Sequence, residues 1–573
     1  MKTIWGEQLQ ADHVLQEYPR PQMRRADYHN LNGLWDYAIT FSDQPPMKWE
    51  GKILVPFSPE APLSGVNRPV LPGQYLWYRR TVTLQPGDGQ RILLHFGAVD
   101  QIATVYLNRR PLGGHTGGYT AFTLDITDQL TGHDELLVRV RDDSDNVPLT
   151  RGKQKTKRGG IWYTPQSGIW QTVWAEAVPQ QYIKNLRIIP RFDDSAVEVT
   201  VETDTAAPCE IIFGGEVYAG AANTPLTIPV PMFHAWSPEH PYLYEFSARC
   251  GADMVDSYFA MRKVEVCPDE HGVPRIHLNG RPYFMHGVLD QGYWPDGLYT
   301  APSDEALIFD IRTMKDMGFN MLRKHIKVEP MRWYYHCDRL GMLVWQDMPN
   351  GGGTDYKFST ISLPLVTKLH KKDNDYAAFA REDAAGRERF LKELDQMILQ
   401  LRNVPSIVLW TPFNEGWGQF DSEAVCSRIR ALDPHRLIDH ASGWHDQGIG
   451  NLQSLHVYFV PYRYKPDKRN RAVILSEYGG YNLMVAGHSY NKKNFGYRRL
   501  KDGEALLQAY TDLMTDQILP AMEKGLSAAV YTQLSDVEDE VNGFWTYDRK
   551  VQKITAAAVR NINLQLTGCN QRR

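Results

Sequence analysis

Short apolar runs separated by turn residues fill the first part of the chain. Residues 78–84, 91–96 and 135–140 are rich in leucine, β-branched and aromatic side chains, and Gly, Pro and Asp lie between them. Regular short strands with turn residues between them are typical of a β-sandwich. The pattern predicts an all-β domain over residues 1–178.

The next part of the chain repeats this rhythm on a smaller scale. Residues 197–202 alternate with period two and place three valines on one face, and residues 210–213 run into a Gly-Gly pair. A segment of this length with such strands predicts an immunoglobulin-like β-sandwich over residues 179–267.

From residue 268 onward, apolar strand-like runs alternate with helical stretches. After Ser303, the residues Leu307, Ile311 and Met314 lie on one helical face, and Gly318 supplies a stop. Eight strands are predicted, of which the fifth and sixth have the weakest patterns; they start near residues 283, 319, 342, 406, 436, 454, 472 and 527. Eight strand–helix units predict a (β/α)8 TIM barrel over residues 268–573.

Two of the predicted barrel strands lead into a glutamate close to a glycine. Glu415 follows the run 406–411, and Glu477 ends the run 473–477. The carboxyl ends of barrel strands form the mouth where chemistry occurs, so these two side chains could face one cleft. Glycoside hydrolysis needs such a pair of carboxyl groups. The alternative is that each glutamate caps a helix or pairs with a surface lysine, and their shared strand-end context favours the catalytic interpretation.

Charge and composition narrow the class of partner. The formal net charge is −4, which gives no support for a nucleic-acid or membrane surface. The basic run 151–158 is interpreted as a solvated loop. With 15 tryptophans and 30 tyrosines on a chain that is not basic, some aromatic faces are expected to stack on sugars, although most belong to the core.

Cysteine usage and the N-terminal residues bear on location and cofactors. The six cysteines lack metal-type spacing, and few cysteines in a large chain suit a reducing compartment. Residues 1–20 contain no apolar core of signal-peptide length. We therefore expect a cytoplasmic protein with no metal and no cofactor, which binds neither nucleic acid nor a membrane. A homo-oligomer is left open.

Several motifs resemble those of glycoside hydrolase family 2, the family of β-galactosidases, β-glucuronidases and β-mannosidases. In chain order they are Tyr18-Pro19-Arg20-Pro21-Gln22, Asn30-Leu31-Asn32-Gly33-Leu34-Trp35, Ile276-His277-Leu278-Asn279-Gly280-Arg281-Pro282, Asn414-Glu415-Gly416 and Ser476-Glu477-Tyr478-Gly479. The resemblance covers nearly the whole chain. It implies a jelly-roll first domain, an immunoglobulin-like second domain and a catalytic barrel.

The resemblance also implies a retaining mechanism with assigned roles. Glu477 would attack the anomeric carbon, while Glu415 would protonate the leaving oxygen and then deprotonate the incoming water. Asn414 would hydrogen-bond the sugar 2-hydroxyl, and Tyr458 would donate to Glu477. The alternatives for these two are a loop cap and strand packing.

Further polar residues at strand ends are expected to bind sugar hydroxyls. These are Arg323 and His325 after the second strand, Asp347 after the third, and Asp290 after the first. In the family, the Arg and His are spaced one residue further apart. The sequence therefore leaves open which side chain of Arg323-Lys324-His325 faces the cleft.

Two departures from the family bear on the sugar. The β-glucuronidases carry an Asn-x-Lys motif that holds the sugar carboxylate, and Phe544 stands here in place of the lysine, which counts against a uronic acid unless another cation substitutes. Tyr531 replaces a family tryptophan, and Trp545 is the candidate replacement platform. A retaining exo-β-glycosidase of the β-galactosidase type is the first expectation. Glucuronidase, mannosidase and arabinosidase remain open, as does a non-catalytic carbohydrate-binding protein.

Overall fold

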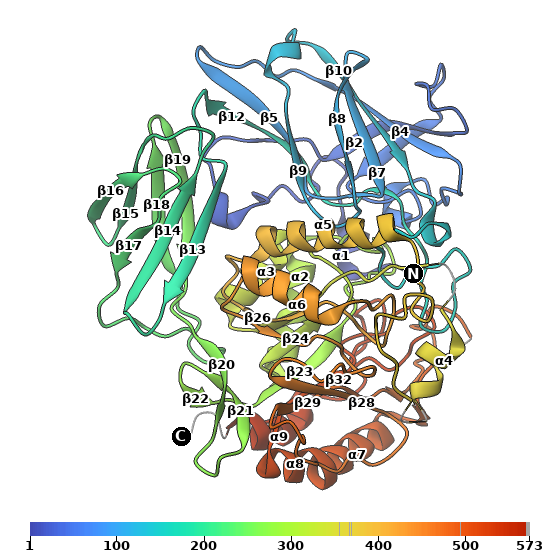
Figure 1. Cartoon of the computed structure of the whole chain (residues 1–573). Helices are drawn as coiled ribbons and strands as arrows, with labels where there is room; N and C mark the ends of the chain where they lie inside the picture. Colours follow the sequence, from blue (N-terminus) through green and yellow to red (C-terminus); the bar gives the residue numbers. More distant parts are fainter. Residues whose placement is uncertain (354–355, 366, 368, 493, 569–573) are drawn as a thin grey trace.

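The structure, a computed structural model, describes residues 1–573 except 354–355, 366, 368, 493 and 569–573. Figure 1 shows three parts: a sandwich of blue strands, a smaller sandwich of green strands, and a barrel below them that carries most of the helices. Helix α5 (Ala384–Leu401) runs along the side of the barrel that faces the first sandwich.

The first sandwich consists of two antiparallel sheets around one apolar core. One sheet has the order β3-β2-β4-β10-β7-β8 and the other β1-β12-β5-β9. Residues such as Trp35, Tyr78, Leu94 and Val138 fill the space between them. The bounds are β1 His29–Asn30, β2 Gly33–Thr40, β3 Gly51–Val55, β4 Tyr75–Val82, β5 Gln90–Phe96, β7 Ile102–Leu107, β8 Arg110–Thr116, β9 Phe122–Asp125, β10 Asp134–Arg141 and β12 Val173–Pro179, with the short pair β6 Val99–Asp100 and β11 Gly168–Ile169.

The second sandwich also has two antiparallel sheets, of orders β13-β14-β17 and β16-β15-β18-β19. Val197, Val199 and Val201 all lie in its core, as the alternation in the sequence requires. The bounds are β13 Asn185–Arg191, β14 Ala196–Glu202, β15 Pro208–Phe213, β16 Glu216–Ala221, β17 Leu226–Pro229, β18 Tyr244–Cys250 and β19 Asp253–Phe259. A small sheet of β20 (Val264–Pro268), β21 (Pro274–Leu278) and β22 (Arg281–Pro282) leads into the barrel.

The predicted barrel is confirmed as a nearly closed ring of eight parallel strands. The order is β27-β26-β25-β24-β23-β32-β29-β28, and no pairing joins β27 to β28 within the described part of the chain. The bounds are β23 Met285–Asp290, β24 Met321–Lys324, β25 Leu343–Asp347, β26 Ile407–Thr411, β27 Leu437–Ile438, β28 Leu452–Val457, β29 Ala472–Gly479 and β32 Leu526–Thr532. Of the two strands with the weakest patterns, β27 and β28, the first is also the shortest in the barrel.

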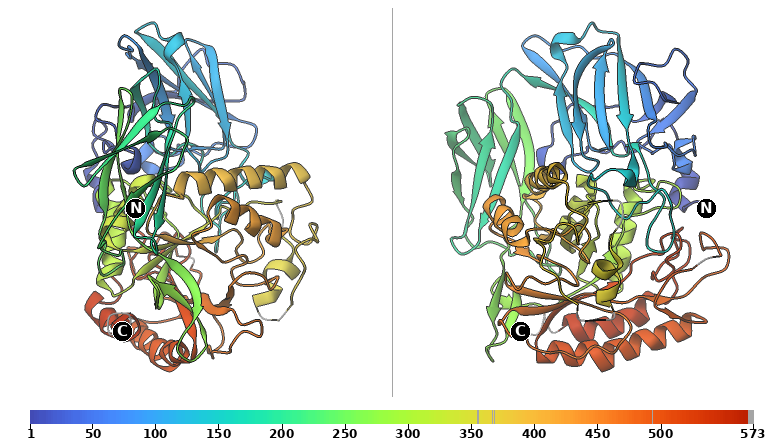
Figure 2. Two further views of the ribbon diagram at one scale, coloured as in Figure 1. Left: turned by 60° about the vertical axis from the view of Figure 1, so that its left-hand side comes forward. Right: turned by 45° about the vertical axis from the view of Figure 1, so that its right-hand side comes forward.

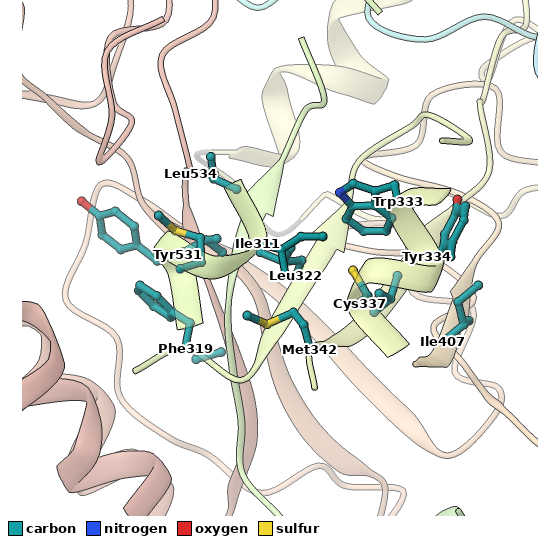
Figure 3. Close-up of a cluster of buried hydrophobic side chains, with 14 of the residues drawn as sticks. Ile311, Phe319, Leu322, Trp333, Tyr334, Cys337, Met342, Ile407, Tyr531 and Leu534 are labelled. Carbon is teal, nitrogen blue, oxygen red and sulfur yellow. The ribbon is translucent and has the colours of Figure 1, made fainter. Parts of the chain in front are cut away.

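Side chains alternate between the two faces of the barrel wall. Met321, Leu343, Ile474 and Val530 belong to the cluster inside the ring, together with other inward-facing residues. Leu322 belongs instead to the cluster between strands and helices, where Figure 3 shows it among Ile311, Trp333 and Met342. This alternation determines which strand-end residues can reach the mouth.

The helices follow the prediction with three differences. Helix α2 (Asp304–Asp316) begins as expected, because the Ser303 side chain accepts from the Ala306 amide. Helix α5 was expected from Tyr376 but starts at Ala384, where Asp383 caps it. The last helix, α9 (Ala556–Thr567), was expected from Val551. The helix expected from Gly503 to Glu523 is interrupted by a π-helical segment, Met514–Ile518. The remaining bounds are α1 Ile4–Gln8, α3 Met331–Leu340, α4 Phe358–Ile361, α6 Ser422–Leu432, α7 Gly503–Leu513 and α8 Leu519–Lys524, with β30 Tyr481–Asn482 and β31 Arg498–Arg499.

The two further views in Figure 2 show α7, α8 and α9 together on one side of the barrel, remote from the first sandwich. None of the described helices is both long enough and apolar enough to cross a lipid bilayer. Each of the five described cysteines is unpaired, and Cys569 lies outside the described residues.

Candidate active site

The period-two alternation of strands β24 and β25 brings three predicted residues to the inside of the barrel mouth. Arg323 lies two residues after the inward-facing Met321, and Asp347 two residues after the inward-facing Trp345. Arg323 donates from Nε and Nη2 to the two oxygens of Asp347, at 3.1 and 2.9 Å. Lys324 takes the opposite face, so the question left by Arg323-Lys324-His325 is resolved in favour of Arg323 and His325.

Glu477, on strand β29, is buried and held by donors on both carboxylate oxygens. Arg323 Nη1 donates to Oε1 at 3.1 Å, and the Tyr458 hydroxyl donates to Oε2. Burial alone would raise the pKa of Glu477, but the charges of His456 and Arg323 outweigh it and lower the pKa to about 2. Glu477 is therefore a carboxylate at neutral pH.

Glu415 lies on the turn after strand β26 in a backbone conformation that favours glycine. Its φ is 51°, and its amide donates to the Ser442 carbonyl at 2.9 Å. This turn directs the side chain across the mouth toward strand β28. Glu415 Oε1 lies 3.1 Å from His456 Nδ1, and one oxygen each of Glu415 and Glu477 lie within 4.8 Å of each other.

Asn414 and His325 each leave a buried polar atom without a partner in the described part of the chain. Asn414 Oδ1 accepts from Arg323 at 2.8 Å, while its Nδ2 has no acceptor. His325 Nδ1 lies 2.7 Å from Asp347, and its Nε2 is unpartnered. Burial, and then the charges of Lys153 and Arg323, hold the pKa of His325 well below its usual value, so the ring is neutral. Since a carboxylate only accepts, Nδ1 carries the proton and Nε2 is free to accept.

Two predicted residues are placed in other surroundings. Asp290 is outward-facing on β23, and its carboxylate accepts from Lys324 Nζ at 2.7 Å and from the Gly292 amide at 2.9 Å. The Trp545 ring packs on Phe309 of helix α2, with centroids 5.0 Å apart. Across the described residues, no hydrogen bond or ring contact joins either one to the glutamate pair. The alternation of β23 explains the first case, and apolar packing against α2 the second.

Comparison with known proteins agrees with this geometry. The glycosyl hydrolases family 2 TIM barrel domain model matches residues 273–551, and the glycosyl hydrolase 2 galactose-binding domain-like model matches residues 68–172. The chain belongs to glycosyl hydrolase family 2. The resemblance stated from the motifs is thus confirmed.

The names of relatives within family 2 refer to different sugars. The chain is 26% identical to a β-galactosidase of Thermoanaerobacter pseudethanolicus over 58% of this chain and 44% of that protein. It is 27% identical to a β-glucuronidase of Bacteroides fragilis over 59% of this chain and 49% of that protein. The chain therefore spans less than half the length of these relatives.

Among solved structures, the β-D-glucuronidase of Dictyoglomus thermophilum superposes with a TM-score of 0.73 at 17% identity, covering 95% of this chain and 98% of that one. A family 2 β-galacturonidase from Eisenbergiella tayi superposes with a TM-score of 0.72 at 18% identity, over 96% and 99% of the two chains. At these identities the likeness concerns the fold.

Sequence reasoning missed His456, which lies between the two glutamates of this family 2 chain. Its Nδ1 is 3.1 Å from Glu415 and 3.6 Å from Glu477, and its Nε2 is 3.0 Å from the Ser442 hydroxyl. A usable signal was present, because His456 precedes Tyr458 by two positions and residues so spaced on a strand share a face.

The basic run 151–158 was interpreted from the sequence as a solvated loop. The structure corrects this for its first residues, which are buried. Arg151, Lys153 and Gln154 are 5%, 7% and 4% exposed. Arg151 donates to the Gly353 carbonyl at 3.0 Å, and the Gly152 amide donates to the Tyr119 hydroxyl at 2.6 Å. These contacts hold a first-sandwich loop against the barrel. No local pattern in the sequence distinguishes this loop from an exposed basic one.

The glutamate pair and His456 are also the one group of described residues spaced for a metal ion, with ligand atoms within 4.8 Å of one another. The hydrogen bonds from Arg323, Tyr458 and Ser442 already account for their positions. That the protein uses no metal is a prediction from the sequence.

Proposed function

We propose that the chain is a retaining exo-β-glycosidase that removes a terminal non-reducing sugar through a covalent glycosyl-enzyme. The observation that carries this proposal is the spacing of Glu415 and Glu477, whose nearest carboxylate oxygens lie within 4.8 Å at the carboxyl ends of the barrel strands. Retaining enzymes hold their carboxyl groups about 5–5.5 Å apart, whereas inverting enzymes need about 6.5–9.5 Å to admit a water.

In the first step, a Glu477 oxygen forms a bond to the anomeric carbon while the bond from that carbon to the leaving oxygen breaks. Glu415 gives its proton to the leaving oxygen. In the second step, Glu415 takes a proton from water, the water oxygen bonds to the anomeric carbon, and Glu477 leaves as a carboxylate. Protons and charges balance over the cycle.

The surroundings of the two carboxyl groups support these different roles. Arg323 and Tyr458 stabilise the ionised form of Glu477, which the nucleophile requires. Among the described residues, no arginine or lysine donates to Glu415, and its hydrogen-bonding neighbour is the His456 ring. The unpartnered amide of Asn414 is available to donate to a sugar hydroxyl beside the nucleophile.

Aromatic rings from both the first sandwich and the barrel support action on a chain end. Trp162 packs against Trp417 with ring centroids 5.2 Å apart and stacks on Tyr356 at 6.1 Å. Trp417 follows Glu415 by two residues, and its ring lies 6.5 Å from the ring of His325. Rings gathered on this side of the glutamate pair favour a terminal sugar over an internal one. Among neutral sugars a β-galactoside is the first to test, with β-mannosides and arabinosides next.

The test is hydrolysis of a panel of aryl β-glycosides by the intact protein and by two variants. Glu477→Gln should lose several orders of magnitude in kcat on every substrate. Glu415→Ala should lose roughly 10²–10⁴-fold on substrates whose leaving group needs a proton, and much less on those with an acidic phenol. Near-full activity of Glu477→Gln would refute the assignment of the nucleophile.

The rival is a non-catalytic carbohydrate-binding protein built on the same barrel. It predicts that the unmodified protein binds sugars, measured by calorimetry, but cleaves no member of the panel. The presence of both glutamates at catalytic spacing favours the enzyme.

A further inference from the structure

The loop that follows the first sandwich carries a lysine to the catalytic pocket. Lys153 lies between Gly152, which is tied to Tyr119, and Gln154, and its carbonyl accepts from the Tyr163 amide at 2.8 Å. Its Nζ lies 5.5 Å from the ring centroid of Trp417, two residues after Glu415. A rigid backbone therefore presents this ammonium group beside the acid/base residue.

Lys153 differs from the other cations around the barrel mouth because no described carboxylate pairs with its charge, which faces only the Trp417 ring. Arg323 pairs with Asp347 and Glu477, Lys324 with Asp290, and Lys327 with Glu329. Lys153 Nζ makes no hydrogen bond and no ion pair with any described residue, although the residue is only 7% exposed. The buried stem therefore ends in an ammonium group that no described carboxylate neutralises, and an anionic ligand would supply a charge-assisted hydrogen bond there.

Two carboxylates on which the charge of Lys153 acts are already engaged. Glu477 is held by Arg323 and Tyr458, and Glu540 accepts from the Tyr163 hydroxyl. The charge of Lys153 nevertheless acts on Glu477 and His325, because it lowers the pKa of both. The Trp417 ring that faces Lys153 Nζ also lies 6.5 Å from the ring of His325, which contacts Asp347, so Lys153 reaches the same pocket wall as His325.

Other unsatisfied donors lie in the same region. Asn414 Nδ2 and Trp417 Nε1 are buried, and neither has an acceptor among the described residues. A group with several acceptor oxygens and a negative charge would satisfy both the donors and the cation.

We propose that Lys153 binds the carboxylate of a terminal hexuronic acid, so that the first sandwich supplies the charge that selects an acidic sugar. This rests on the proposed glycosidase function. It also answers the objection raised by Phe544, an uncharged side chain that is buried against Phe319, with ring centroids 5.6 Å apart. The cation that family β-glucuronidases place after the eighth strand would here come from another domain.

The experiment compares sugars that differ only at carbon 6. The kcat and KM of the full chain and of Lys153→Met are measured on aryl β-glucuronide and β-galacturonide, and on the matching glucoside and galactoside. We expect the unmodified protein to prefer a uronide. Lys153→Met should lower kcat/KM on that uronide roughly 10–100-fold, which is the size expected for the loss of one hydrogen bond to a charged group. Most of this loss should come from a higher KM. Both neutral sugars should change little.

Lys157→Met is the matched control, because Lys157 is exposed on the same loop, and it should leave all four substrates unchanged. An unmodified protein that cleaves only neutral sugars would overturn the proposal. So would an equal loss on all four substrates in Lys153→Met, together with a displaced acid limb of the pH profile, because that result means Lys153 only tunes Glu477.

Failure of the glycosidase function can be told apart from failure of this subsite. If no aryl glycoside is cleaved, calorimetry with free glucuronate and galacturonate against glucose and galactose still tests Lys153. Uronate binding that is weakened in Lys153→Met supports the subsite, and absence of uronate binding overturns it.

Discussion

His456 connects the two carboxyl groups through one ring. Its Nδ1 is within hydrogen-bonding distance of Glu415 and close to Glu477, while Nε2 contacts the Ser442 hydroxyl. A histidine in this position can share a proton with Glu415 and at the same time stabilise negative charge on Glu477.

Replacing His456 by Gln should displace the acid limb of the pH–rate profile. As the proposed nucleophile, Glu477 acts in its ionised form. Burial raises the pKa of Glu477, but the charges of His456 and Arg323 outweigh it and lower that pKa to about 2. Loss of the His456 contribution raises that pKa, so activity should start to fall at a higher pH as the solution is acidified. The measurement is kcat/KM between about pH 3 and 7, the range in which carboxyl groups and histidine titrate.

His488→Gln provides the control, since His488 is half-buried and pairs with Asp548. It should leave the profile in place. An unchanged acid limb in His456→Gln would mean that the ring contributes nothing to the ionisation of Glu477.

The sequence could place Glu415 and Glu477 because each follows an apolar strand and strand ends meet at one mouth. It could also place Tyr458, whose hydroxyl donates to Glu477. Lys153 could not be found in this way, because its role depends on a loop that packs across a domain boundary. Trp545 was expected in the pocket, and its position shows that an aromatic residue after a strand packs on a helix equally well.

At the scale of elements, the barrel strands were predictable because period-two alternation and continuous apolar runs are local properties. Strand β24 illustrates this: its alternation sends Arg323 inward and Lys324 outward, toward Asp290. The late start of α5 was not predictable from periodicity. Residues before Ala384 are instead held by Arg381, which donates to the Gly418 carbonyl at 2.7 Å.

The loop that carries Lys153 makes a test at this scale possible. A Cβ on Gly152 would lie 1.9 Å from the Tyr299 hydroxyl and 3.1 Å from the Ile326 carbonyl oxygen. Gly152→Ala should therefore displace the loop, lower the free energy of unfolding by about 1–3 kcal/mol, and reduce kcat/KM at least as much as Lys153→Met. Thermal unfolding and steady-state kinetics measure the two effects.

Gly568→Ala is the control, because nothing lies within 4 Å of its Cβ position. It should change neither quantity. Wild-type kinetics in Gly152→Ala would show that the loop can move without affecting the pocket.

At the scale of the whole molecule, one buried carboxylate joins the two sandwiches. Glu176, on β12, accepts from Arg20 at 2.9 Å and from Arg25 at 2.8 Å. Arg25 also donates to Asp253 of β19 in the second sandwich, at 2.7 Å. Because Arg25 pairs with both Glu176 and Asp253, we expect the relative orientation of the two sandwiches to depend on the charge of Glu176.

Replacing Glu176 by Gln should lower Tm through the loss of a buried ion pair, worth about 3–5 kcal/mol when one partner is removed. Burial would raise the pKa of Glu176, but Arg20, His95 and Arg25 outweigh it and hold the pKa well below the usual range. A carboxyl group of this kind contributes stability above its unfolded pKa and loses it as the pH falls. The Tm difference between the two proteins should thus be large at neutral pH and shrink below about pH 4.

Calorimetry across pH measures this difference. Glu210→Gln is the exposed-pair control, since Glu210 pairs with Arg249 at side-chain exposures of 34% and 48%. Surface pairs contribute about 0–1 kcal/mol. Equal Tm losses in both variants, or a Glu176→Gln effect that does not depend on pH, would contradict the view that this buried charge links the sandwiches.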